Sequence, residues 1–282
     1  MSGLVLLTTL RYCPAHSEPY PLLHYHTARL RNAWSHFAEP AQGEFPEELE
    51  ERIIQQIYTS CKGLGQSSDW RVRVLLDLTT AGVKVEFYPM PSGSPPFQFN
   101  LEPFVLAKVQ AGKPIVLDPL ASALPVIPSH TAGTDPESFA TDPADLYRYK
   151  TTERRGYEDA ARRGKAVSTE TQIFDTLLHW PREMAREDST RNRITELTTS
   201  NIAIHCPSSA HHAQWITPRY HADGAPFLRG VMRAHLLSLD ALREEDITVE
   251  RFMQLVQEGR AVVGLNGLRG IWLANPILFP QE

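Results

Sequence analysis

The sequence has little cysteine, no long apolar run and no strong excess of one charge. Its three cysteines, Cys13, Cys61 and Cys206, are too scattered for a disulfide framework or a CxxC metal site, so we expect a reducing compartment. No apolar segment is long enough to cross a bilayer, and the first residues carry no basic leader. We therefore expect a cytoplasmic protein without a signal peptide. The net charge of -5 gives no reason to expect a nucleic-acid partner.

Several common ligand motifs are also absent. The sequence contains no GxGxxG, GxxxxGK[ST] or GxSxG, which argues against dinucleotide, P-loop and nucleophile-elbow hydrolase sites. Histidine pairs occur at His24/His26 and at His211–His212, but neither pair has carboxylate or cysteine companions at ligand spacing. No metal site is therefore predicted.

Apolar periodicity predicts helices and strands in both halves of the chain. The first half has predicted strands at 4–12, 71–77, 83–88 and 114–117, and predicted helices at 24–37 and 46–64. Because these elements do not alternate strictly, the first half is expected to be an α+β unit with an antiparallel or mixed sheet. The second half has predicted helices at 153–166 and 230–239, strands at 172–180, 193–204, 214–217, 261–265 and 271–274, and a short strand leading into a helix at 245–250.

A stretch rich in proline separates the two halves. Residues 119–149 contain five prolines and show no periodicity, as is typical of a linker or a long loop beside an active site. We therefore expect a small domain at 1–118, an interdomain linker or loop at 119–149, and a larger domain at 150–282. The charged segment 181–192 is expected to be a solvated hairpin loop.

Five short motifs follow one another in the order found in one enzyme family. They are HTARL at 26–30, KTT at 150–152, ELTTSN at 196–201, WITP at 215–218 and GVMR at 230–233. Together they resemble the H-x-x-R-L, Schiff-base lysine, E…N, T-P and G-[IV]-x-R elements of class IV aminotransferases, the fold type IV enzymes that bind pyridoxal 5'-phosphate. The resemblance covers nearly the whole chain. It implies a two-domain α+β fold, with a small α/β N-terminal domain, a larger C-terminal domain around a mixed, barrel-like sheet, the cofactor in the cleft between them, and a homodimer.

The resemblance also implies a role for each motif residue. Lys150 would form the imine with the cofactor aldehyde and then act as the proton-transfer base. Glu196 would keep the pyridine nitrogen protonated, and the alternative is that it is an ordinary solvated strand glutamate. Arg29 and the backbone N–H groups of Val231 and Met232 would bind the phosphate.

Four further positions receive weaker assignments from the same resemblance. Asn266 and Gly267 lie where the family places another phosphate-contacting turn. Arg154 lies near the place where relatives have a tyrosine or arginine beside the phenolic oxygen of the cofactor. Arg269 is a candidate for binding a substrate carboxylate.

Two features favour a lyase over a transaminase. The TTLR segment at 8–11 is similar to the [TE]-T-[LA]-R pattern of 4-amino-4-deoxychorismate lyases, and the Thr9 hydroxyl could serve a leaving enolpyruvate oxygen. The alternative for Thr9 is a strand threonine chosen for its β propensity. The segments KTT at 150–152 and NGLRG at 266–270 look like those of lyase domains fused to aminodeoxychorismate synthases.

The resemblance thus implies a lyase that converts 4-amino-4-deoxychorismate to 4-aminobenzoate and pyruvate on the folate route. One alternative is a class IV aminotransferase acting on an amino acid or amine. Another is a weakly active relative kept as a binding protein, which departures from the family pattern favour. Gly267 stands where relatives have serine or threonine, and Arg229 where they have an apolar residue or proline.

Overall fold

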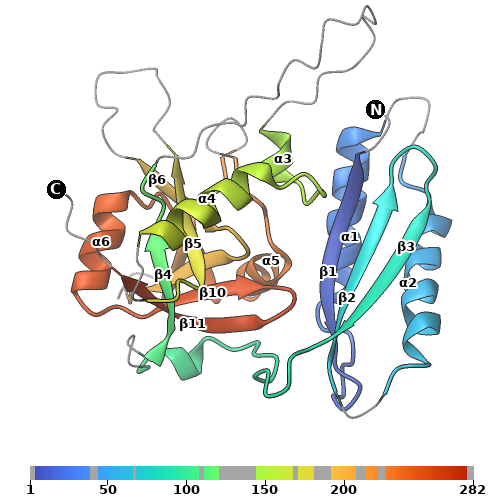
Figure 1. Cartoon of the computed structure of the whole chain (residues 1–282), viewed down its shortest axis with the longest axis horizontal. Helices are drawn as coiled ribbons and strands as arrows, with labels where there is room; N and C mark the ends of the chain where they lie inside the picture. Colours follow the sequence, from blue (N-terminus) through green and yellow to red (C-terminus); the bar gives the residue numbers. More distant parts are fainter. Residues whose placement is uncertain are drawn as a thin grey trace, which may run out of the picture.

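The computed structural model describes residues 4–38, 44–65, 68–107, 111–120, 144–167, 171–180, 192–207, 214–221 and 226–277. Two sheets lie side by side, a small one built from the start of the chain and a larger one built from the rest (Figure 1). The predicted fold class, a mixed α+β architecture with a small and a large unit, is confirmed. Among the described helices, none is long and apolar enough to span a membrane.

The small sheet is antiparallel and has the order β1-β2-β3. Its strands are β1 (Val5–Tyr12), β2 (Trp70–Asp77) and β3 (Val83–Pro89). One face carries buried aliphatic residues at every second position, such as Val72 and Val74, and packs on helices α1 (Leu23–Phe37) and α2 (Glu47–Cys61). The other face contributes polar residues of β1 and β2 to the site described below.

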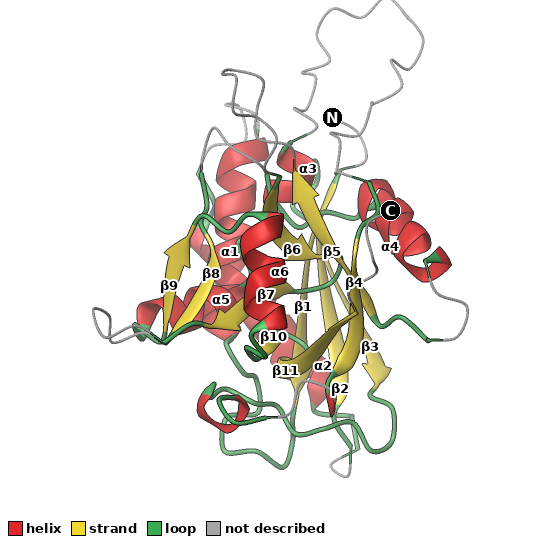
Figure 2. Ribbon diagram, turned by 90° about the vertical axis from the view of Figure 1, so that its left-hand side faces the viewer, coloured by secondary structure: helices red, strands yellow, loops and turns green. Residues whose placement is uncertain are grey.

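The larger sheet has eight strands in the order β6-β5-β4-β11-β10-β7-β8-β9 and is curled (Figure 2). It is mixed, because β4 runs parallel to both β5 and β11, and β8 runs parallel to β9, while the other pairs are antiparallel. The strands are β4 (Lys113–Leu117), β5 (Asp175–Trp180), β6 (Arg193–Leu197), β7 (Asn201–His205), β8 (Trp215–Pro218), β9 (Leu242–Glu245), β10 (Val262–Asn266) and β11 (Gly270–Ile277). The helices are η2 (Glu102–Phe104), α3 (Asp145–Arg148), α4 (Arg155–Ala166), α5 (Val231–Ser238) and α6 (Val249–Gln257).

The structure corrects three sequence predictions about individual segments. The strand predicted at 114–117 is β4, and it pairs with β5 and β11 of the larger sheet instead of with strands of the first half. The short strand predicted at 245–250 is wrong in position, because β9 ends at Glu245 and Thr248 is the N-cap of α6, accepting a hydrogen bond from Arg251 N at 3.1 Å. The stretch 119–149, predicted as a linker, contains the short helix α3. Residues 121–143, 181–191 and His211–His212 lie outside the described residues.

Two backbone hydrogen bonds join the small sheet to the segment after α3. Leu7 N donates to Lys150 O at 2.8 Å, and Thr152 N donates to Val5 O at 3.1 Å. These bonds use the edge of β1 that does not pair with β2. The backbone of Lys150 is therefore fixed against the small sheet, although α4, which begins five residues later, packs on the larger one.

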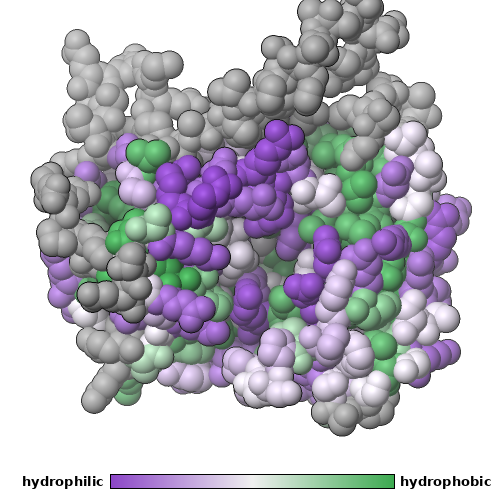
Figure 3. Space-filling model, viewed as in Figure 1, coloured by the Kyte–Doolittle hydropathy of each residue, from purple (hydrophilic) through white to green (hydrophobic). Residues whose placement is uncertain are grey.

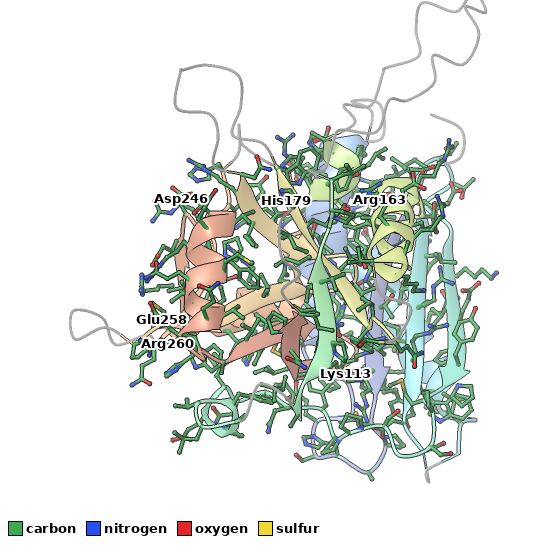
Figure 4. All side chains as sticks on the ribbon, turned by 60° about the vertical axis from the view of Figure 1, so that its left-hand side comes forward. Lys113, Arg163, His179, Asp246, Glu258 and Arg260 are labelled. Carbon is green, nitrogen blue, oxygen red and sulfur yellow. The ribbon has the colours of Figure 1, made fainter. Side chains whose placement is uncertain are left out.

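Helix α4 is attached to the larger sheet through Asp118, the residue after β4. Arg163 on α4 donates to both carboxylate oxygens of Asp118, at 2.8 and 2.5 Å, and His179 on β5 lies 2.9 Å from its carbonyl oxygen (Figure 4). The outer face of α4 is charged, and Figure 3 shows a band of hydrophilic residues over it. The segment from Lys150 to α4 is thereby held at both ends.

We expect Gly164→Ala to destabilise the fold by about 1–3 kcal/mol. A Cβ atom at Gly164 on α4 would lie 2.0 Å from Oγ1 and 2.9 Å from Cγ2 of Thr176 on β5. Thr176→Ala removes both atoms and leaves only Cβ, at 3.0 Å, so Gly164→Ala should cost much less free energy of unfolding in the Thr176→Ala background than in the wild type. Gly63→Ala is the matched control, because a Cβ there meets nothing within 4 Å. If Gly164→Ala lowers the free energy of unfolding equally in the wild type and in the Thr176→Ala variant, the packing explanation is wrong.

Candidate active site

A cavity of about 320 Å³ lies between the two sheets. Its walls come from β1 and β2, the Lys150 segment, the β6–β7 turn, the start of α5 and the β10–β11 turn. The predicted site residues that line it are Thr9, Arg29, Lys150, Arg154, Glu196, Val231, Asn266, Gly267 and Arg269. Met232 is not among them: its side chain is fully buried in an apolar cluster around α5, and a role for its backbone N–H stays a prediction.

The amine of Lys150 faces this cavity. It forms no hydrogen bond or ion pair with any residue that the structure describes. Burial, together with the positive charges of Arg29, Arg154 and Arg73, holds the pKa of the amine well below its ordinary value of 10.5. A lowered pKa favours the neutral amine, which is the form that can attack an aldehyde carbon.

Glu196 is a buried carboxyl group with one oxygen engaged. Its Oε1 accepts hydrogen bonds from the Tyr157 hydroxyl at 2.7 Å and from Leu228 N at 3.0 Å. Burial raises the pKa of Glu196 to about 8, and these two hydrogen bonds limit the rise. The other oxygen has no hydrogen-bond partner among the described residues, so it can accept a hydrogen bond from a protonated ring nitrogen in the cavity. The alternative prediction of a solvated strand glutamate is wrong, because the residue is only 3% exposed.

Arg29 and the start of α5 form an anion-binding corner. The Arg29 guanidinium donates to the Thr8 hydroxyl, has no carboxylate partner within the described chain, and has its pKa lowered to about 10 by burial. Gly230 caps α5, with its N–H donating to Asn201 Oδ1 at 2.9 Å, and a Cβ at Gly230 would lie 2.1 Å from the same oxygen. The free N–H groups of the first turn, including that of Val231, therefore remain available for an anion.

The β10–β11 turn explains why glycine stands at position 267. A Cβ there would lie 2.5 Å from Cε1 of His26 and 2.6 Å from Cγ2 of Val231. The His26 ring, held through Nδ1 by the Thr8 hydroxyl at 2.7 Å, fills the space that a serine or threonine side chain would need. The departure at Gly267 is thus matched to a buried histidine on α1.

Asn266 shapes the same turn. Its Oδ1 accepts hydrogen bonds from Leu268 N at 3.0 Å and Arg269 N at 2.7 Å, and its Nδ2 donates to the Ser200 hydroxyl at 2.9 Å. The turn closes at Gly270, whose positive φ of 71° suits glycine. Within the structure, Asn266 therefore positions backbone groups at the cavity wall.

Sequence reasoning missed three residues that line the cavity. Tyr157 lies seven positions after Lys150 and binds Glu196; nothing in the local pattern marks it, because it reads as an apolar position of α4. Arg71 and Arg73 alternate on β2, and the register that pairs Arg73 with Thr9 places them on the cavity face. Strand alternation could have identified both once Thr9 was assigned.

Arg154 forms no ion pair with a carboxylate among the described residues. Its Nη2 donates to Thr198 O at 2.7 Å, and its guanidinium lies over the Tyr157 ring at 4.7 Å from the centroid. It also favours the charged form of Glu196. The structure thus brings Arg154 to the Glu196 side of the cavity, and contact with a phenolic oxygen stays a prediction.

Comparison with known proteins gives one family and several structures. Residues 6–275 match the family described as amino-transferase class IV. No curated protein matches the sequence. A candidate 4-amino-4-deoxychorismate lyase from Haemophilus somnus 129PT is similar in structure, with a TM-score of 0.54, 15% identity, and coverage of 96% of this chain and 99% of that one.

Two further solved structures share the fold. An aminotransferase from Brucella abortus bound to pyridoxal phosphate has a TM-score of 0.60 and 14% identity, covering 96% of this chain and 80% of that one. A fold IV transaminase from Curtobacterium pusillum has a TM-score of 0.56 and 13% identity, covering 100% and 80%. At these identities the likeness concerns the fold.

We expect Glu196→Gln to stabilise the cofactor-free protein, by an amount that grows with pH. The carboxyl ionises near 4.5 in the unfolded chain and near 8 in the fold, so its contribution to stability is full below pH 4.5 and is lost as pH rises to about 8. Glutamine does not titrate, and its amide oxygen can accept the same hydrogen bonds from Tyr157 and Leu228.

Urea unfolding at pH 5, 6.5 and 8 measures this effect. The difference in free energy of unfolding between variant and wild type should increase by on the order of 3 kcal/mol across that range. Glu158→Gln, on the exposed face of α4, serves as the control. A difference that stays constant with pH contradicts the assignment of a raised pKa to Glu196.

Proposed function

The chain belongs to the class IV aminotransferase family, whose members use pyridoxal phosphate, and on this premise we propose that it is a lyase converting 4-amino-4-deoxychorismate to 4-aminobenzoate and pyruvate. Support comes from the composition of the cavity wall. It contains six basic side chains, namely Arg29, Arg71, Arg73, Lys150, Arg154 and Arg269, and two carboxyl groups, those of Glu153 and Glu196. Such a wall suits a phosphorylated cofactor together with a substrate that carries more than one carboxylate.

The residues present fit pyridoxal phosphate. Arg29 and the N-terminus of α5 offer charge and N–H donors to a phosphate, and neither is neutralised by a carboxylate within the described residues. Glu196, buried with a pKa near 8, gains a partner if a ring nitrogen beside it carries a proton. Lys150 supplies the amine that an aldehyde requires. We assign these roles as part of the proposal.

The position of Thr9 is the observation that favours a lyase over a transaminase. It lies on β1 two residues from Leu7, whose N–H donates to the carbonyl of Lys150, and both side chains line the cavity. The Thr9 hydroxyl has no hydrogen-bond partner among the residues that the structure describes. An unused hydroxyl beside the lysine can donate to the ether oxygen that leaves with the enolpyruvate group.

Each residue then has a defined task. When bound, pyridoxal phosphate supplies an aldehyde for amines and a protonated ring that accepts an electron pair. Lys150, in its neutral state, takes the proton from the ring carbon that bears the substrate amine. Thr9 donates to the departing oxygen, and the enolpyruvate takes up a proton to become pyruvate. The remaining ring is aromatic, which drives the elimination.

A transaminase is the second candidate. It is favoured by the two structural neighbours named as an aminotransferase and a transaminase. Both reactions begin with the same proton removal by lysine, and they differ in what leaves. A homodimer, a cytoplasmic location and the folate route stay predictions.

We expect purified holoenzyme, given 4-amino-4-deoxychorismate and no keto acid, to release pyruvate and 4-aminobenzoate in equal amounts. Lys150→Ala should abolish this release, because Lys150 is the only lysine among the described residues that line the cavity. Lys165→Ala, exposed on α4, is the matched control. Absence of both products, with an amino donor bleaching the cofactor absorbance, would overturn the lyase in favour of transamination.

We expect Thr9→Val to lower kcat of the lyase reaction by about 10- to 100-fold with a smaller change in KM. Valine keeps the shape of the side chain and removes the hydroxyl. Thr9→Ser, which keeps the hydroxyl, should retain most of the activity. Equal kcat for the valine and serine variants would mean that the hydroxyl takes no part in the chemistry.

A further inference from the structure

Arg71 is a cation of the cavity wall with unused hydrogen-bond donors. Its guanidinium lies over the ring of Tyr88, 4.4 Å from the centroid, and its Nε is buried without a partner. Arg11, its neighbour across the β1–β2 ladder, is by contrast bound to Asp69 and to the carbonyl of Pro95. In the described parts of the chain no carboxylate lies within ion-pair distance of Arg71. It is therefore positioned by stacking and left free to bind an anion.

Arg269 reaches the same cavity from the larger sheet. Its backbone N–H donates to Asn266 Oδ1 at 2.7 Å, and its guanidinium lies over the Phe174 ring at 5.2 Å from the centroid. The negative charge of Asp175 acts to raise the pKa of Arg269 against the effect of burial, but the two side chains form no ion pair. The Asp175 carboxylate instead accepts hydrogen bonds from the hydroxyls of Thr198 and Thr199, each at 2.5 Å. Arg269 thus also has no ion-pair partner among the described residues.

The two arginines line the same cavity, one from each sheet. Burial lowers the pKa of Arg269; the charge of Asp175 opposes this shift, and the positive charge of Arg71 adds to it. Two cations that face one cavity from different sheets repel each other unless an anion lies between them. A carboxylate relieves this repulsion and accepts charge-assisted hydrogen bonds from both groups.

Arg71 lies on the side of the cavity away from the backbone of Lys150. Leu7, whose N–H donates to Lys150 O, is paired with Leu75 in the β1–β2 register, and Arg73 is paired with Thr9, two residues further from that contact. Arg71 lies two residues from Arg73, about 7 Å further along β2. In 4-amino-4-deoxychorismate the ring carboxylate lies across the ring from the amine, so an amine at Lys150 directs this carboxylate away from the lysine.

We propose that Arg71 and Arg269 clamp the ring carboxylate of the substrate, the carboxylate that remains in 4-aminobenzoate. This inference rests on the proposed lyase function and names the recognition element of the same site. Arg71 contributes from the small sheet and Arg269 from the larger one. The clamp therefore selects amines that carry a carboxylate at the opposite end of a six-membered ring.

Binding of two product-like probes to the holoenzyme tests the clamp. 4-Aminobenzoate has the carboxylate, and 4-aminobenzamide has the same shape without the charge. By calorimetric titration, wild type should bind 4-aminobenzoate at least tenfold more tightly than the amide. Arg71→Gln and Arg269→Gln should each weaken 4-aminobenzoate binding about 10- to 100-fold and leave the amide unchanged.

Three further comparisons decide the result. Arg162→Gln, exposed on α4, should bind both probes like wild type. The double variant should lose less than the product of the two single losses, because one carboxylate serves both arginines. Thermal unfolding and cofactor absorbance check that each variant is folded and loaded, and Arg269→Gln tests the clamp if Arg71→Gln does not fold.

Equal binding of the two probes by wild type, or equal weakening of both probes in the variants, would refute the clamp. This outcome is separate from failure of the proposed function. If pyruvate is not released but the probes behave as expected, the lyase proposal fails and the carboxylate clamp stands. If pyruvate is released and the variants bind 4-aminobenzoate like wild type, only the clamp fails.

Discussion

The site depends on two backbone hydrogen bonds between the edge of β1 and the segment that carries Lys150. They place a residue of the larger unit on the edge of the small sheet, so the lysine, Thr9 and the arginines of β2 share one surface. Because successive side chains in β1 and β2 point to opposite faces of the sheet, the two faces have different roles. One face packs on α1 and α2, and the other face offers polar groups to the cavity. The position of the Lys150 backbone is therefore set by main-chain geometry, which side-chain substitution changes little.

Charge is the second constraint. The cavity wall has several guanidinium groups whose partners are aromatic rings, hydroxyls or carbonyls instead of carboxylates. Leaving such groups unpaired reduces the stability of the fold, and their positive charges add to the effect of burial in lowering the pKa of the Lys150 amine. Anionic ligands reverse the first effect, so binding and folding are linked in this protein. The buried carboxyl of Glu196 is the acidic counterpart: among the described residues it forms no ion pair, and the more distant charge of Arg154 favours its charged form.

Much of the fold was readable from the sequence, because strands, helices and family motifs are local patterns. The lysine, Thr9, Arg29 and Glu196 were found this way, and the structure brings them to one cavity. Contacts between distant segments were not readable. The role of Tyr157 depends on its hydrogen bond to Glu196, which is 39 positions away in the sequence. A short apolar run such as β4 does not show which sheet it will join. The prediction of a strand at 245–250 was wrong because the alternating pattern there includes Thr248, which is the N-cap of α6.

The close contact between His26 and Gly267 has a consequence for how this site can vary. The imidazole and any side chain at position 267 compete for the same volume, across an interface between α1 and the β10–β11 turn. A larger residue at 267 therefore requires a smaller one at 26 and a shift of Val231, whose Cγ2 would lie 2.6 Å from the new Cβ. Thr8 then also loses its hydrogen bond to His26 Nδ1. A transfer of cofactor contacts from related proteins into this chain has to change all three positions together.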